Sequence, residues 1–119
     1  MTTRTRSEVL ADRARPILLN IALYGLTIAY GQLAAVIHLP GEPLLDNRAM
    51  GKVLGTLAKA DAAAGAPYDL TAFVVNAHTG EVGRGFTSWL SPAPAKEQRL
   101  TATRLLGGRT HDHMRVVNG

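Results

Sequence analysis

The sequence predicts a mainly helical domain that carries one β-hairpin. Apolar residues recur at helical spacing in three stretches between residues 7 and 64, which predicts three helices. After Gly65 the pattern changes to two short runs rich in β-branched residues, with a glycine-containing turn between them. The chain has 119 residues, of which 46% are hydrophobic and 18% charged. These values fit one folded domain and exclude wholesale disorder.

The first predicted helix covers about residues 7–24, with Ser7 as its N-cap. Pro16 lies inside this helix, and a proline there predicts a kink or a break near Arg15. A short extended step over residues 26–29 follows and leads into the second helix.

The second predicted helix covers residues 30–37, and the third covers residues 47–64. The loop between them is rich in proline and glycine, which break helices. Asp46 or Asn47 is expected to cap the third helix, and Gly65 is well placed to end it.

The predicted hairpin joins a strand over residues 70–76 to a second strand over residues 81–87. Gly80 lies in the loop between them, where a residue with positive φ is needed. Three helices followed by a hairpin is the element order of a winged helix. The second and third helices would then form a helix-turn-helix pair, and the hairpin would be the wing.

The predicted domain boundaries follow from these elements. Residues 1–6 are expected to be a flexible N-terminus, and residues 7–90 the winged-helix domain. Residues 91–119 read as a proline-containing linker, a sequence compatible with a short basic helix, and a mobile tail.

A long uncharged segment raises the question of a membrane span. Residues 16–41 contain no Lys, Arg, Asp or Glu and are long enough to cross a bilayer. Asn20 and Gln32 interrupt the apolar run, however, and Gly25 breaks its helical period. We therefore expect two buried helices and no membrane partner. The N-terminus has mixed charges and no secretory pattern, so a cytoplasmic location is expected.

The charge balance and the missing cysteines restrict the function. Thirteen Lys and Arg residues against nine Asp and Glu residues give a net charge of +4, which permits a polyanionic partner. The absence of cysteine excludes a disulfide, a thiolate metal site and a cysteine nucleophile. The four histidines have no evident acid or nucleophile partner, so we expect no enzyme activity, no cofactor and no metal site.

The third predicted helix has two opposite faces. At about 100° per residue, Arg48, Lys52 and Lys59 fall within about 40° of one another. Gly51 and Gly55 flank this basic stripe, and glycines allow a helix to approach another surface closely. The opposite face is apolar and consists of Met50, Val53, Leu54 and Leu57. A basic, glycine-lined face suits the major groove of DNA.

Two other interpretations of this helix stay open. The basic stripe has the composition of an ordinary solvated helix face, on which the glycines are incidental. The domain would alternatively be a protein-interaction module, with Met50, Leu54 and the 38–47 loop as its interface. A homodimer belongs to that second interpretation, because a small domain gains core from a partner.

The segment 17–55 resembles the DNA-binding part of the alkylguanine-DNA alkyltransferases and of the alkyltransferase-like proteins. The family pattern G-x-x-x-S-Y-x-x-L-A is matched at Tyr30, Leu33 and Ala34, and its R-A-V-G pattern at Arg48, Ala49 and Gly51. Further on, LTAFVVNAHTGEVGRGF is similar to the family's catalytic strand and the glycine turn that follows it. The resemblance covers residues 17–86.

The same comparison shows where this chain departs from the family. Alignment on the paired valines places Thr71 at the family's cysteine, Ala72 at its histidine and Phe73 at its arginine. The nucleophile and its base are therefore missing, and the loops on both sides of Arg48 differ in length. The resemblance implies a non-catalytic scaffold that binds double-stranded DNA.

In the family the tyrosine acts on the backbone of the target nucleotide, and the arginine fills the gap left by the flipped base. By resemblance these roles fall to Tyr30 and Arg48, for which we expect groove or phosphate contacts. The full set of expected DNA-binding residues is Tyr30, Gln32, Arg48, Gly51, Lys52, Gly55, Lys59 and Arg84.

Overall fold

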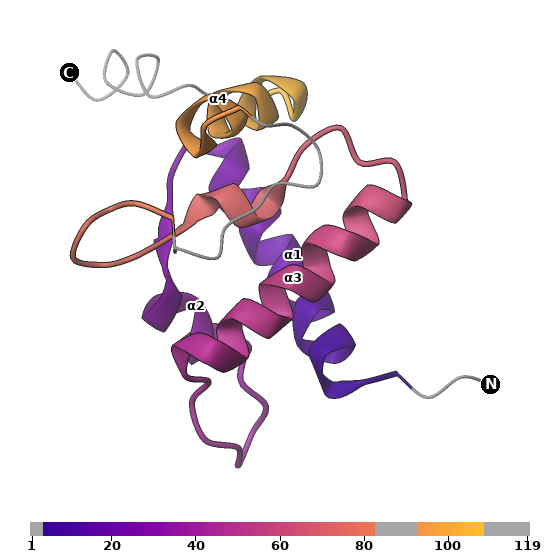
Figure 1. Cartoon of the computed structure of the whole chain (residues 1–119), viewed down its shortest axis with the longest axis vertical. Helices are drawn as coiled ribbons and strands as arrows, with labels where there is room; N and C mark the ends of the chain where they lie inside the picture. The colour runs from indigo at the N-terminus through magenta and orange to yellow at the C-terminus, as the bar shows by residue number, and fades with distance from the viewer. Residues whose placement is uncertain (1–3, 83–92, 109–119) are drawn as a thin grey trace.

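The computed structural model describes residues 4–82 and 93–108, and it confirms the mainly helical fold class (Figure 1). Its elements in chain order are α1 (Arg6–Leu23), β1 (Ile28–Ala29), α2 (Tyr30–Ile37), α3 (Asn47–Ala63), the 3-10 turn η1 (Leu70–Phe73), β2 (Val74–Val75) and α4 (Ala95–Leu105).

Helix α1 forms the centre of the fold. It begins after Thr5, whose hydroxyl accepts a hydrogen bond from the Glu8 N–H, while the Glu8 carboxylate accepts one from the Thr5 N–H. This capping box starts the helix two residues before the expected Ser7 cap. The buried residues Leu10, Ala14, Leu18 and Ala22 recur at every fourth position and form the inner stripe. Against α1 pack α2, α3, η1 and α4.

Pro16 does not break α1, so of the two expected outcomes, a kink or a break, the break is wrong. The helix is continuous from Arg6 to Leu23 with Pro16 inside it. Pro16 is exposed to solvent, so the backbone group that loses its hydrogen bond lies on the outer face of the helix. Water can satisfy a carbonyl on that face.

Two arginines of α1 fix the positions of α2 and α3. Arg13 Nε donates a hydrogen bond to the carbonyl of Ile37, the last residue of α2, over 2.8 Å. Arg15 Nε donates to Asp61 Oδ1 of α3 over 2.9 Å, and Arg15 also pairs with Asp12 at 2.7 Å. In Figure 1, α3 crosses α1, and α2 lies beside the N-terminal half of α3.

The segment expected to be a strand over residues 70–76 has a different structure. Its first four residues form the turn η1, and only Val74 and Val75 are extended. The Asp69 side chain produces the turn, because its Oδ1 accepts hydrogen bonds from both the N–H and the hydroxyl of Thr71. Residues 69–75 are all buried. A continuous apolar run of this kind does not distinguish a strand from a buried helical turn.

Strand β2 pairs with β1 in parallel. Ile28 is paired with Val74, and Ala29 with Val75, so the two short strands connect distant parts of the chain. The sequence analysis took residues 26–29 as a simple connection and missed this pairing.

The turn at the tip of the expected hairpin does form. Gly80 has φ +70° and donates its N–H to the Asn76 carbonyl at 2.8 Å, and the Asn76 N–H donates to the Glu81 carbonyl at 2.7 Å. The expected second strand, residues 81–87, lies outside the described residues from 83 onward. The wing is therefore an interpretation that the described residues do not establish.

Helix α4 is part of the same core, so the domain continues beyond residue 90, where the sequence analysis ended it. Ala102 and Thr103 are buried, and the Thr103 hydroxyl donates to the Ala22 carbonyl of α1 at 2.8 Å. The helix packs on η1 and α1, and its buried residues are Gln98, Ala102 and Thr103. The proline-rich segment before it is a connection within one domain.

The segment 16–41 is divided between two helices and a strand, which matches the expectation of two helices. In the described part of the chain, no helix has both the length and the apolarity that crossing a bilayer requires.

Candidate nucleic-acid interface

Helix α3 is held by its apolar face and presents the opposite face to solvent. Asp46 caps it, with Oδ1 accepting from the Ala49 N–H at 2.8 Å, and Gly65 with φ +79° lies just beyond its end. Both features agree with the sequence analysis. The residues of α3 that are buried in the core are Met50, Val53, Leu54, Leu57 and Ala58.

The five residues predicted on the outer face are all exposed. We call this surface the basic face of α3; it consists of Arg48, Gly51, Lys52, Gly55 and Lys59. The spacing by three and four residues places them along one side of the helix over its full length.

The positive charges of the basic face are not neutralised within the described structure. The ion pairs between described residues use Arg4, Arg6 and Arg15 as cations, and none includes Arg48, Lys52 or Lys59. The two acidic residues nearest in sequence have other roles. Asp46 caps the helix, and Asp61 accepts from Arg15. The face is therefore free to attract an external polyanion.

Packing between the described residues does not require either glycine of the basic face. A Cβ atom built at Gly51 or Gly55 would meet no heavy atom within 4 Å, and neither residue has a positive φ. Glycine inside a helix costs about 1 kcal/mol relative to alanine. Both glycines therefore lower the stability of α3, and no contact with another described residue requires a glycine at either position.

The two DNA-binding candidates on α2, Tyr30 and Gln32, have contacts within the fold. Tyr30 is half-buried and packs against the hydrophobic core at the start of α2. Gln32 is exposed, but its Oε1 accepts a hydrogen bond from the Ala29 N–H at 3.0 Å and caps the start of α2. The last candidate, Arg84, lies outside the described residues.

Thr71, which aligns with the family's cysteine, is a structural residue here. It is buried, and its hydroxyl donates to Asp69 Oδ1 at 2.6 Å inside the capped turn. Its neighbours Ala72 and Phe73 are also buried. The hydroxyl is thus held by the carboxylate that caps the turn. Among described residues there is no cluster of three His, Cys, Asp or Glu side chains that would hold a metal ion.

Two of the residues expected at a protein interface are buried in the core. Met50 and Leu54 are 1% and 6% exposed and belong to the core of this chain, so they are not available to a partner. The loop after α2 keeps an exposed apolar side chain at Leu44, which is 62% exposed.

The sequence analysis missed the residues that position the interface. Arg13 and Arg15 attach α2 and α3 to α1, a role that was not predicted for either residue. Their position at helical spacing from the buried stripe of α1 was visible in the sequence, but their distant partners were not.

Comparison with models of protein families, with curated proteins and with solved structures finds no match to this chain. The resemblance to the alkyltransferase-like group therefore remains a prediction from residue patterns alone.

Proposed function

We propose that this protein binds double-stranded DNA without catalysing a reaction, and that the basic face of α3 enters the major groove. One observation carries the proposal: three exposed cations without acidic partners in the described structure share a helix face with two glycines that the fold does not require. Lys and Arg provide attraction to phosphates, and the glycines allow the helix backbone to approach the base edges closely.

The arrangement of α2 and α3 supports this mode of binding. In helix-turn-helix proteins the second helix enters the groove while the first crosses the DNA backbone. Here α2 packs beside the N-terminal half of α3, and α1 holds both through Arg13 and Arg15. The alkyltransferase-like winged helix is the scaffold that this proposal implies.

The proposal predicts different effects at the two ends of α3. Arg48 and Lys59 are eleven residues apart, which is about 16 Å of helix rise. The N-terminal residues of a recognition helix reach the bases, so Arg48→Ala should cost about 1–3 kcal/mol of binding free energy and alter any sequence preference. Lys59→Ala should weaken binding equally on all sequences and reduce the salt slope by about one. Fluorescence anisotropy with several duplexes at varied salt measures both effects.

Arg104→Ala is the matched control, because Arg104 is an exposed cation on α4, away from α3. If Arg104→Ala lowers the affinity as much as Arg48→Ala, only the net charge matters and the interface is wrong. If Arg48→Ala and Lys59→Ala lose the same binding free energy and have the same salt slope, α3 contacts only the phosphates and not the bases.

Replacing the two glycines by alanine is expected to raise stability and to weaken DNA binding. Gly51→Ala and Gly55→Ala should each raise the free energy of unfolding by about 0.5–1 kcal/mol, because both sites are helical and open. The double variant should bind duplex DNA more weakly, since two methyl groups hold the helix away from the groove. Urea unfolding and anisotropy measure the two quantities on the same protein.

Ala60→Gly serves as the reverse control, because Ala60 is exposed on α3 but lies off the basic face. It should lower stability and leave the affinity unchanged. Unchanged affinity of the Gly51→Ala/Gly55→Ala variant would refute close approach of the helix to DNA.

A protein partner is the second candidate, and the exposed Leu44 together with Val36, which is 55% exposed, favours it. If a partner or a second copy of the chain binds there, the double substitution Arg48→Ala/Lys52→Ala leaves that association intact while it removes DNA binding. A pull-down or a sedimentation experiment with this variant separates the two functions.

A further inference from the structure

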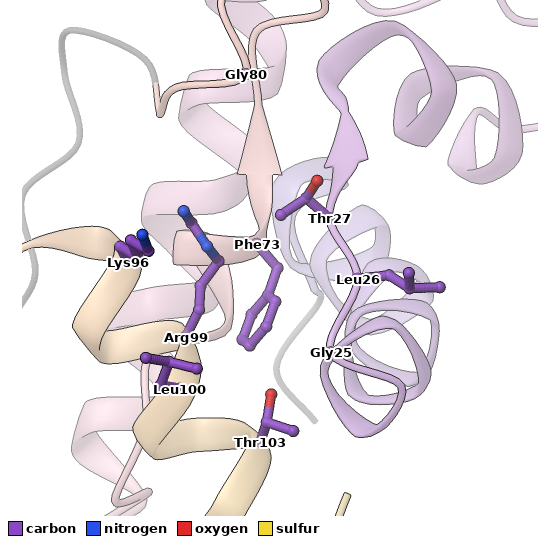
Figure 2. A pocket seen from close by; sticks show the side chains of 9 residues that line it. All are labelled: Gly25, Leu26, Thr27, Phe73, Gly80, Lys96, Arg99, Leu100 and Thr103. Atoms are coloured by element: carbon purple, nitrogen blue, oxygen red, sulfur yellow. The ribbon is translucent and has the colours of Figure 1, made fainter. Parts of the chain in front are cut away.

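A cavity of about 390 Å³ lies on a different part of the molecule from the basic face of α3 (Figure 2). It opens between the chain that leaves α1, the turn η1 and one side of α4. We call it the α4 pocket and define it by Thr27, Phe73, Lys96, Arg99, Leu100 and Thr103. Its volume is at the lower end of the range of cavities that hold small molecules.

Two cations of α4 lie on one side of this pocket. Lys96 and Arg99 are three residues apart, so they lie on the same side of the helix, and both line the pocket (Figure 2). None of the lining residues is acidic.

Arg99 is a partly desolvated cation with a single described acceptor. Its side chain is half-buried, and Nη1 donates to the Ala72 carbonyl at 2.9 Å. Burial lowers the pKa of the Arg99 guanidinium, and the charge of the exposed Glu81 offsets this only in part. A guanidinium has five N–H donors in a fork that matches an oxyanion. Desolvation of a cation is costly, and a bound anion would reduce that cost.

The rest of the pocket is apolar or carries hydroxyl groups. The Phe73 ring lies beside the Arg99 side chain, and Leu100, Thr27 and Thr103 complete the lining (Figure 2). The Thr103 hydroxyl already donates its proton to the Ala22 carbonyl, so toward a ligand it acts as an acceptor. Cations at one side and apolar side chains beside them match a molecule with a charged head and a compact apolar body.

We propose that the α4 pocket binds a small organic anion, whose oxyanion head pairs with Arg99 and Lys96 and whose apolar body lies against Phe73 and Leu100. This site is separate from α3 and does not depend on the DNA-binding proposal. The shared chemistry of the ligand is a carboxylate or a phosphate ester on a small ring or alkyl group.

Calorimetric titration of the full chain with phenyl phosphate and with benzoate tests this proposal without DNA. Both probes should saturate one site, whereas inorganic phosphate and benzyl alcohol, which each lack one half of the ligand, should bind at least about tenfold more weakly. Equal affinity for inorganic phosphate, or for benzyl alcohol, would overturn the proposal, because only one of the two recognition elements would then operate.

Variants locate the site. Arg99→Gln should weaken phenyl phosphate binding by about tenfold or more, and Lys96→Gln by a smaller factor. Arg104→Gln, on the same helix but outside the pocket, should leave the affinity unchanged. An equal loss with Arg104→Gln would show that the probe responds only to net charge and would refute the site.

Arg99 also holds the Ala72 carbonyl, so a thermal melt accompanies every variant. If Arg99→Gln does not fold, Leu100→Trp decides the question, because its indole fills the cavity and leaves both cations in place. Loss of phenyl phosphate binding in a folded Leu100→Trp protein supports the pocket, and unchanged binding overturns it.

Discussion

Reversal of the three charges on the basic face of α3 is expected to abolish binding to duplex DNA. The variant Arg48→Glu/Lys52→Glu/Lys59→Glu should lose about a thousandfold in affinity or more at moderate salt, because three phosphate attractions become repulsions. All three side chains are exposed and none belongs to an ion pair between described residues, so their replacement breaks no described salt bridge. A glutamate at position 48 also interacts favourably with the N-terminal end of the helix dipole.

The measurement is anisotropy of a labelled duplex, with a melting curve of each protein. Arg104→Glu is the single-charge control on α4 and should change the affinity only slightly. If the triple variant keeps its melting transition and still binds DNA within about threefold of the original chain, the proposed interface is refuted.

The second large effect is expected in the core. Leu57→Ala should lower the free energy of unfolding by about 2–5 kcal/mol, because Leu57 is completely buried and α3 packs against α1 at this face. Urea denaturation measures the loss, which is a large part of the stability of a domain of this size. The control is Val36→Ala on α2, whose side chain is 55% exposed, and its effect should stay within about 0.5 kcal/mol. A loss of less than about 1 kcal/mol for Leu57→Ala would show that the face of α3 is assigned incorrectly.

The parts of the fold with strong local signals were predictable from the sequence. Helix α2 has the expected bounds. Helix α3 begins where expected and ends only one residue before the expected position, because Asp46 and Gly65 mark its two ends. The orientation of α3 was also predictable, since its apolar residues and its basic residues lie on opposite sides of the helix axis. The start of α1 was misplaced although the Thr5 and Glu8 pair carries the pattern of a capping box.

Other parts depended on contacts between distant residues, and no local pattern shows that Val74 pairs with Ile28. The turn η1 was missed for another reason: Asp69 caps it through Thr71, only two residues away, but the apolar run that follows Asp69 also fits a strand. The inclusion of α4 in the core depends on Thr103 reaching Ala22, and a proline-rich segment before the helix suggested the opposite. The same holds for the candidate sites: the basic face follows one helix and was visible, whereas the α4 pocket unites three separate segments.

The bond between Thr103 and Ala22 has a consequence for how the chain reaches its final state. It joins residues 81 positions apart in a chain of 119 residues, so covering the C-terminal end of α1 requires the closure of a long loop. Contacts of such long range slow folding, because the entropy of loop closure is lost before the contact contributes any stabilisation. During synthesis α1 is made before α4, so the part of α1 around Ala22 stays uncovered until α4 has left the ribosome. A nascent chain that stops before α4 would therefore expose apolar surface around Ala22, and it would be open to chaperones and proteases during that interval.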